Sequence, residues 1–181
     1  MKIAIDIDDT LTNTKENQIK LWKEYIKNNP NPDYTEELPY NINEFDAGEY
    51  ISIFWDTYRD KLSFESTYKQ EASTIIDKLK EDGHELCVVT SRPNDRYSNL
   101  HERISKALKD NNIHIDTIYS NVRDKGSFCK EHNFDLLIDD NIKQVESVLN
   151  NGLKGILFNK TDKDIPKVSS WQEIYEIIKN M

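Results

Sequence analysis

Five short apolar segments, each bounded by polar or turn residues, constrain the fold of this chain more than any other feature of its sequence. They are rich in isoleucine, valine and leucine and do not alternate between apolar and polar residues, which is typical of strands buried on both faces. The segments are Lys2 to Ile7, Glu85 to Thr90, Thr117 to Tyr119, Leu136 to Ile138 and Gly155 to Phe158. We therefore expect a parallel sheet covered by helices.

Helical patterns fill the gaps between these segments. Tyr68 to Leu79 has apolar residues at helical spacing and is followed by Gly83, which suits a left-handed C-cap. Further helices are predicted at Tyr97 to Leu108 behind a cap at Asn94 or Asp95, at Lys125 to His132, at Ile142 to Leu149, and after the capping box Ser170-x-x-Glu173. The alternation of strand and helix predicts a three-layer α/β sandwich, with functional groups at the carboxyl ends of the strands.

Residues 14–64 interrupt this alternation, because no convincing strand occurs there and a first crossover of this length is unusual. We interpret them as a helical cap inserted into a core domain of residues 1–13 and 65–181, with helices at Lys15 to Asn28 and around Glu49 to Lys61. The cap is rich in aromatic residues: Trp22, Tyr25, Tyr34, Tyr40, Phe45, Tyr50, Phe54, Trp55 and Tyr58. Most of these rings are expected to pack the cap, although one or two could face a ligand.

Composition narrows the class of protein. A length of 181 residues corresponds to about one domain with a small insertion. The net charge of −9 disfavours binding to a nucleic acid polymer. No apolar stretch approaches the roughly 20 residues that cross a bilayer, and Asp6 interrupts any signal-peptide segment, so the cytoplasm is the expected location. Cys87 and Cys129 lack metal-binding spacing and are expected to be buried thiols.

Two carboxylates follow the first predicted strand. Side chains alternate along a strand, so Asp6 and Asp8 project on the same side. Like charges this close raise each other's proton affinity unless a cation lies between them, which implies a shared proton or a bound metal ion. Taken alone, the pair could equally be a solvated acidic turn.

The other predicted strand ends favour a functional site. The second strand ends in Thr90, Ser91 and Arg92, which offer hydroxyls, backbone donors and a cation. Lys125 opens a predicted helix, and the acidic pair Asp139-Asp140 follows the fourth strand. These groups should converge on one edge of a parallel sheet.

This ordered set resembles the haloacid dehalogenase superfamily of phosphohydrolases, whose four motifs match Asp6-x-Asp8-x-Thr10, Thr90, Lys125 and Asp139-Asp140. The resemblance implies a Rossmann-like sandwich with a helical cap after the first motif. Within the superfamily, the sequence looks most like the 5′(3′)-deoxyribonucleotidases and their bacterial nucleotidase relatives. Asp9 departs from the pattern, because many members of the superfamily have glycine there.

The resemblance also implies roles for the motif residues. Asp6 would attack phosphorus and form an aspartyl-phosphate, and Asp8 would act as general acid and then general base. Mg²⁺ would be held by Asp6, the backbone carbonyl of Asp8, Asp139 and Asp140. Thr90 and Lys125 would stabilise the charge of the transferring phosphoryl group.

Three further residues, Lys130, Ser91 and Arg92, are considered for a role at the site. Lys130 is a rival to Lys125, but it lies five residues further along the same predicted helix and is expected in solvent. Ser91 is a candidate substrate-binding residue. Arg92 could bind a second anionic group of the substrate or pair with an acidic side chain.

The expected function is Mg²⁺-dependent hydrolysis of a small phosphomonoester, with a deoxynucleoside monophosphate as the first substrate to test and a sugar phosphate as the alternative. A response-regulator receiver also combines acidic residues, a Thr or Ser and a Lys, but its Lys comes last in the chain, whereas Asp139 and Asp140 follow Lys125 here. A non-catalytic nucleotide-binding module would not need every catalytic position filled. The oligomeric state stays open.

Overall fold

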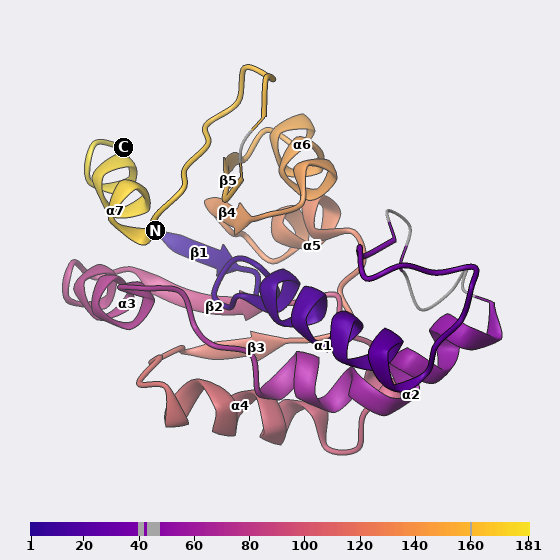
Figure 1. Cartoon of the computed structure of the whole chain (residues 1–181). Coiled ribbons are helices and arrows are strands. Elements are labelled where there is room, and N and C mark those ends of the chain that lie inside the picture. The colour runs from indigo at the N-terminus through magenta and orange to yellow at the C-terminus, as the bar shows by residue number, and fades with distance from the viewer. Residues whose placement is uncertain (40–41, 43–47, 160) are drawn as a thin grey trace. The chain divides into compact units, whose positions relative to one another are not determined.

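The structure is a computed structural model that describes residues 1–39, 42, 48–159 and 161–181 (Figure 1). It divides into two compact units. The core unit comprises Met1–Thr12 and Tyr68–Met181, and the helical unit comprises Asn13–Thr67. The helical unit is thus an insertion in the sequence of the core unit.

The core unit is built on a five-stranded sheet with the order β3-β2-β1-β4-β5, in which every neighbouring pair is parallel. The strands are β1 (Lys2–Ile5), β2 (Glu85–Val89), β3 (Thr117–Tyr119), β4 (Leu136–Asp139) and β5 (Lys154–Leu157). The helices are α3 (Ala72–Glu81), α4 (Leu100–Asp110), α5 (Lys125–Glu131), α6 (Ile142–Asn150) and α7 (Trp171–Lys179). The predicted α/β class and parallel sheet are confirmed.

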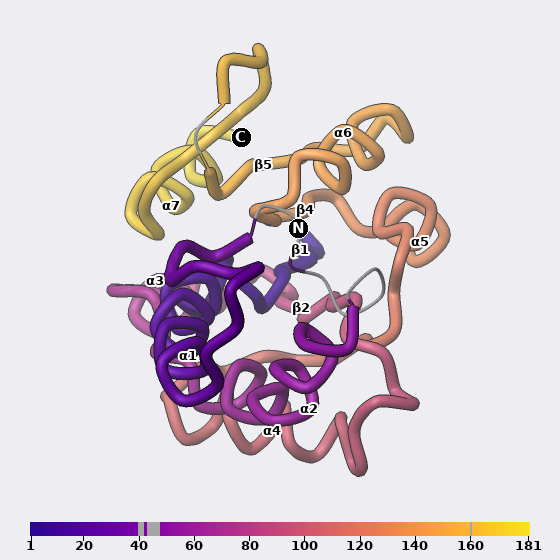
Figure 2. Tube along the Cα trace, turned by 45° about the vertical axis from the view of Figure 1, so that its right-hand side comes forward, coloured from indigo at the N-terminus to yellow at the C-terminus, as the bar shows by residue number. Residues whose placement is uncertain are grey.

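Helices cover both faces of the sheet, which makes three layers. Helices α3 and α7 pack together on one face, and α5 and α6 pack together on the other (Figure 2). Side chains alternate along each strand, so Ala4, Cys87 and Leu137 face the α5 and α6 layer, where they join Cys129 and Val148 in one buried cluster. This explains the continuous apolar composition of the strands. Both cysteines are buried and free, as expected.

The contact between α5 and α6 is unusually close at one residue. A Cβ atom on Gly126 would lie 2.1 Å from Oγ of Ser147 and 2.7 Å from its backbone oxygen. The first turn of α5 therefore accepts only glycine at this position, because any side chain would push the two helices apart.

Two predicted helix starts are wrong. Helix α4 begins at Leu100 behind Asn99, which has a φ of +52°, whereas Asn94–Arg96 form a separate 3₁₀ turn. The Asn94 side chain instead accepts a hydrogen bond from Ser120, so it is not available as a cap. Helix α3 begins at Ala72 rather than Tyr68, because Tyr68 pairs with Thr12 in an isolated antiparallel bridge.

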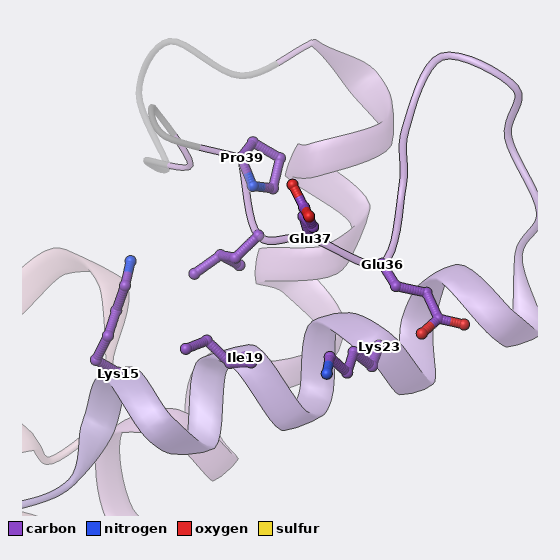
Figure 3. Close-up of a pocket in the computed structure, with 7 residues that line it drawn as sticks. Lys15, Ile19, Lys23, Glu36, Glu37 and Pro39 are labelled. Atoms are coloured by element: carbon purple, nitrogen blue, oxygen red, sulfur yellow. The ribbon is translucent and has the colours of Figure 1, made fainter.

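Two long helices frame the helical unit, α1 (Thr14–Asn28) and α2 (Glu49–Phe64). The indole N–H of Trp22 donates to the carbonyl oxygens of Thr35 and Glu37 at 2.9 and 3.1 Å, which fixes the chain that follows α1. An open cavity of about 720 Å³ lies between α1 and this segment (Figure 3). Its lining residues are Lys15, Ile19, Lys23, Glu36, Glu37, Leu38 and Pro39.

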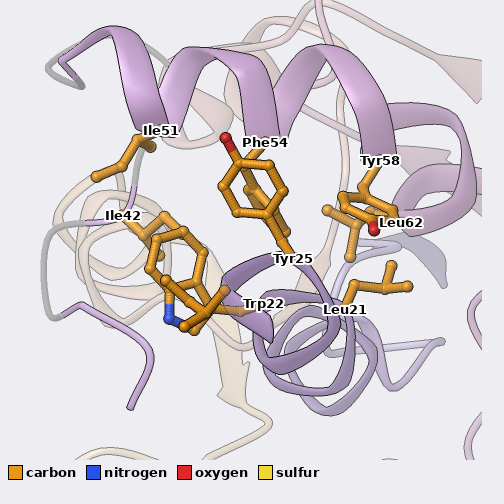
Figure 4. Close-up of a cluster of buried hydrophobic side chains, with 9 residues drawn as sticks. Leu21, Trp22, Tyr25, Ile42, Ile51, Phe54, Tyr58 and Leu62 are labelled. Carbon is orange, nitrogen blue, oxygen red and sulfur yellow. The ribbon is translucent and has the colours of Figure 1, made fainter. Parts of the chain in front are cut away.

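The described aromatic residues build the core of the helical unit (Figure 4). The rings of Trp22 and Phe54 meet edge to face with centroids 5.3 Å apart, and those of Tyr34 and Tyr50 stack at 4.7 Å. Tyr40 and Phe45, which belong to the predicted aromatic set, lie outside the described residues. The rings that the structure describes therefore pack largely against one another.

Within the described parts of the chain, no helix combines the length and the apolar character needed to cross a membrane.

We predict that Gly126→Ala lowers the free energy of unfolding by about 2 kcal/mol, because the added methyl group overlaps the backbone of Ser147. Denaturant unfolding monitored by circular dichroism would measure the change. Gly48→Ala is the control, since a Cβ there meets nothing within 4 Å, and it should cost only the roughly 1 kcal/mol or less expected when alanine replaces glycine at a helix N-cap. Equal stability of the two variants would contradict the close packing of α5 on α6.

Candidate active site

Four segments of the core unit meet at the carboxyl ends of the strands. Strand β1 lies between β2 and β4, so the residues that follow these three strands are neighbours although they are far apart in sequence. A cavity of about 200 Å³ opens there. Its lining residues are Asp6, Asp8, Asp9, Ser91, Lys125, Asp139, Asp140, Asn141 and Gln144. The structure therefore brings the predicted acidic residues and the predicted lysine to one small polar cavity.

Lys125 is the cation in the wall of the cavity. Its ammonium group is 2% exposed, donates to Oδ1 of Asp6 and lies 2.6 Å from Oδ2 of Asp139. Burial alone would lower the pKa of Lys125, but the two carboxylates outweigh burial and raise it. Lys125 therefore stays charged and binds the ends of β1 and β4 together. Lys130, the rival lysine, is exposed as expected.

Three contacts place Lys125 at the start of α5. The Asp124 side chain caps the helix by accepting from the backbone N–H groups of Gly126 and Ser127. Gln144 on α6 accepts from the Lys125 backbone N–H at 3.0 Å and donates to the carbonyl oxygen of Arg123 at 2.8 Å. The sequence analysis identified neither Asp124 nor Gln144. An aspartate directly before a helix is a capping signal that could have been found, whereas nothing local in the sequence marks Gln144.

The carboxylates of Asp6, Asp139 and Asp140 form an acidic cluster in which one oxygen of each lies within 4.8 Å of the others. Burial raises the pKa of Asp6 to about 7 against the opposing charge of Lys125. Burial and the charges of Asp6 and Asp139 raise the pKa of Asp140 to about 8. Carboxylates this close together repel one another when they are ionised. A hard divalent cation bound to their oxygens would offset this repulsion. When ionised, three carboxylates and one ammonium leave two negative charges, so the residues present fit Mg²⁺.

Asp8 has a separate partner. Nε of Arg92 donates to Oδ2 of Asp8 at 2.9 Å, and a terminal nitrogen of Arg92 donates to Oδ1 at 2.8 Å. The guanidinium is 6% exposed, whereas the Asp8 side chain is 37% exposed. Asp6 and Asp8 are neighbours in the sequence, but each pairs with a different cation.

The residues after β2 occupy two different environments. Ser91 is exposed and lines the cavity, whereas Thr90 and Arg92 are buried and are not among the described residues that line it. The Thr90 hydroxyl oxygen accepts from the Arg92 backbone N–H at 3.3 Å, so its own proton can be donated elsewhere.

Asp9 lies in the turn that follows β1, at the position where the resemblance implied glycine. Its φ is +56°, in the left-handed region. Aspartate is among the few non-glycine residues that adopt this conformation readily. The loop is further anchored where the Thr10 carbonyl oxygen accepts from the Trp171 indole at 3.1 Å. The charge of Asp9 also contributes to the raised pKa of Asp140.

The fold is that of the haloacid dehalogenase-like hydrolases. No protein-family model matches the chain. Among solved structures, one described as a predicted phosphatase from Clostridium acetobutylicum superposes with a TM-score of 0.71 at 19% identity, covering 99% of this chain and 98% of that one. A haloacid dehalogenase hydrolase from Bacillus subtilis, solved bound to magnesium, has a TM-score of 0.70 at 15% identity and covers 98% of both chains.

A curated protein of Bacillus cereus, described as "Putative nucleotidase", is 25% identical over 192 aligned residues, which cover 99% of this chain and 98% of that protein. Together with the fold and the order of the site residues, this relative supports the haloacid dehalogenase superfamily for the chain. The fold that the resemblance to this superfamily implies is thus confirmed.

We predict that Mg²⁺ stabilises the protein more as the pH rises. The pKa values of Asp6 and Asp140, about 7 and about 8, lie above that of an unfolded aspartate, so the folded state binds protons more tightly. Their contribution to stability is complete below about pH 4 and is lost as the pH rises through these values. A divalent cation takes the place of the protons, so its stabilising effect should appear over the same range.

Thermal unfolding with MgCl₂ and with EDTA at about pH 5 and about pH 9 would measure this, with an expected gain of a few degrees at the higher pH only. Asp140→Asn should reduce the gain, whereas Asp164→Asn, in an exposed loop, should retain it. A gain that is the same at both pH values would contradict the acidic cluster as the binding site.

We also predict that Lys125→Met, measured in EDTA at about pH 8, lowers the free energy of unfolding by about 3 kcal/mol, because it leaves two buried carboxylates without their cation. The loss should shrink at about pH 5, where Asp6 is protonated. Lys130→Met, on the exposed face of the same helix, is the control and should cost less than about 0.5 kcal/mol. Denaturant titration gives both values, and a loss independent of pH would count against the proposed pairing.

Proposed function

We propose that this chain is a Mg²⁺-dependent phosphomonoesterase that acts through an aspartyl-phosphate on Asp6, with deoxynucleoside monophosphates as its substrates. The observation that carries the proposal is the buried ammonium of Lys125 between Asp6 and Asp139, at the wall of a small polar cavity that also contains Asp140. The hydrolase class is further supported by the haloacid dehalogenase neighbours and by the curated relative.

Asp6 is the proposed nucleophile. Lys125 contacts one of its carboxylate oxygens, Oδ1, which leaves Oδ2 to attack the phosphorus atom. The attack forms an oxygen–phosphorus bond to Asp6 and breaks the bond to the leaving alcohol. Lys125 offsets negative charge on Asp6 and on the phosphoryl oxygens as they approach each other. The Thr90 hydroxyl would donate a hydrogen bond to the same phosphoryl group, and Ser91 would contact the substrate from the wall of the cavity.

Asp8 is the proposed proton carrier. It lies at the cavity two residues beyond Asp6, close enough in the chain to serve both halves of the reaction. In the first half its protonated form gives a proton to the leaving alcohol oxygen. In the second half its carboxylate takes a proton from the water that attacks the aspartyl-phosphate, which releases phosphate and restores Asp6.

The acidic cluster would hold the metal ion. Carboxylate oxygens of Asp6, Asp139 and Asp140, together with the backbone carbonyl of Asp8, are the proposed ligands. When bound, Mg²⁺ supplies positive charge that permits a phosphate dianion to approach these carboxylates. Asp139 is well suited to this role because its second oxygen, Oδ1, accepts from the Asn141 backbone N–H at 2.8 Å, which fixes the carboxylate.

The size of the cavity bears on the substrate. About 200 Å³ of polar space accommodates a phosphoryl group but not a nucleoside as well, since pockets that enclose whole small ligands usually exceed about 300 Å³. The nucleotide assignment is supported by the description of the Bacillus cereus relative and by the motifs. We also propose that residues 14–64 act as a cap. They lie within Asn13–Thr67, a separate helical unit that is inserted after β1.

We predict that the purified protein releases phosphate from deoxynucleoside monophosphates in the presence of Mg²⁺ and not in EDTA. A colorimetric phosphate assay over a panel of deoxynucleotides, ribonucleotides and sugar phosphates would measure it. Asp6→Asn should lower kcat by about three orders of magnitude or more, because the amide is a poor nucleophile. Asp164→Asn is the control and should leave the rate unchanged.

The panel also separates the alternatives. Turnover of sugar phosphates alone would replace the nucleotide assignment while retaining the phosphomonoesterase. Nucleotide binding without any turnover would favour a non-catalytic module. Turnover that Asp6→Asn does not affect would overturn the mechanism.

A further inference from the structure

Arg92 is buried at the edge of the proposed active site and pairs with the carboxylate of Asp8. Its Nε and one terminal nitrogen donate to the two oxygens of Asp8 at 2.9 and 2.8 Å. Two parallel hydrogen bonds between a planar guanidinium and a planar carboxylate fix the orientation of both groups. Arg92 therefore determines where the Asp8 carboxylate points.

The backbone at Arg92 is held as firmly as its side chain. The Arg92 carbonyl oxygen accepts from the N–H of Asn121 at 2.9 Å, and the Thr90 carbonyl oxygen accepts from Val122 at 3.0 Å. These bonds tie the segment after β2 to the segment after β3. The guanidinium thus extends from a hydrogen-bonded turn to the Asp8 carboxylate.

Arg92 is linked to the cavity through Asp8. Asp8 lines the cavity, whereas Arg92 is 6% exposed and is not among the described residues that line it. Two of the five guanidinium N–H donors, one on Nε and one on a terminal nitrogen, are engaged by the two Asp8 oxygens. Of the two roles considered from the sequence, binding a second anionic group of the substrate and pairing with an acidic side chain, the structure shows the second.

We infer that Arg92 is a positioning residue that acts through Asp8 and holds its carboxylate in place for the proton transfers. The inference rests on the proposed phosphomonoesterase activity, in which Asp8 gives a proton to the leaving alcohol oxygen and later takes one from water. Arg92 itself contacts neither the phosphoryl group nor the metal ion. A lysine cannot replace it, because an ammonium group cannot donate two parallel hydrogen bonds to one carboxylate in a fixed plane.

The dependence on the leaving group tests this role. An alkyl phosphate, such as the best nucleoside monophosphate of the panel, loses an alkoxide that must be protonated, whereas 4-nitrophenyl phosphate loses a stable phenolate that need not be. The ratio kcat/KM reports the steps up to loss of the leaving group. We expect Arg92→Lys to lower kcat/KM by about 100-fold for the alkyl phosphate and by less than about 3-fold for 4-nitrophenyl phosphate.

The matched control is Arg96→Lys, four residues further on and exposed, which should leave both rates unchanged. The inhibition constant for inorganic phosphate is a second readout, and it should be the same in Arg92→Lys and in the wild type. Thermal unfolding of each variant establishes that it folds. If Arg92→Lys does not fold, Arg92→Gln is tested in its place.

A double-mutant cycle tests whether Arg92 acts through Asp8. In an Asp8→Asn background, Arg92→Lys should produce no further loss with the alkyl phosphate, because the group that it positions is already absent. A further loss of 10-fold or more would overturn the inference.

The remaining outcomes distinguish a failure of the inference about Arg92 from a failure of the proposed function. Equal losses for both substrates, or a weaker affinity for inorganic phosphate, would show that Arg92 contacts the substrate and would overturn the inference while leaving the phosphomonoesterase intact. A wild-type protein that hydrolyses neither substrate would overturn the proposed function, and the role of Arg92 with it.

Discussion

The arrangement of this site depends on one buried cation between two carboxylates. Lys125 reaches Asp6 at the end of β1 and Asp139 at the end of β4, so three distant segments are joined at one ammonium group. A buried lysine is tolerated only when paired, and this requirement fixes the start of α5. The Asp124 cap, the two hydrogen bonds of Gln144 and the close approach at Gly126 all act on that start. These local contacts therefore fix the position of the Lys125 ammonium group.

A second ion pair gives the two neighbouring aspartates different environments. Asp6 is nearly buried and contacts an ammonium group, whereas Asp8 is partly exposed and held by a planar guanidinium. Carboxylates of the same type can take opposite roles in a reaction when their surroundings differ in this way. The proposed nucleophile would benefit from a cation that also faces the phosphoryl group, and the proposed proton carrier would benefit from a cation that fixes its direction without lining the cavity.

The helical unit has a core of its own, which bears on how a base could be recognised. The described rings of this unit pack edge to face or stack on one another around Trp22 and Phe54. Rings that pack against one another in this way stabilise the helical unit itself. The cavity in the core unit, in turn, is polar and of the size of a phosphoryl group. The proposed phosphate site therefore lies within the core unit.

The sequence by itself determined the parallel sheet and the convergence of Asp6, Lys125 and Asp139, because strand composition and strand ends are local properties. It placed helix starts less well, since Tyr68 and Asn94 are held by tertiary pairs that local periodicity does not reveal. Only the tertiary structure decided the partner of Arg92 and the role of Gln144. Both depend on which segments lie side by side after folding, and a long-range contact leaves no periodic signal in the chain.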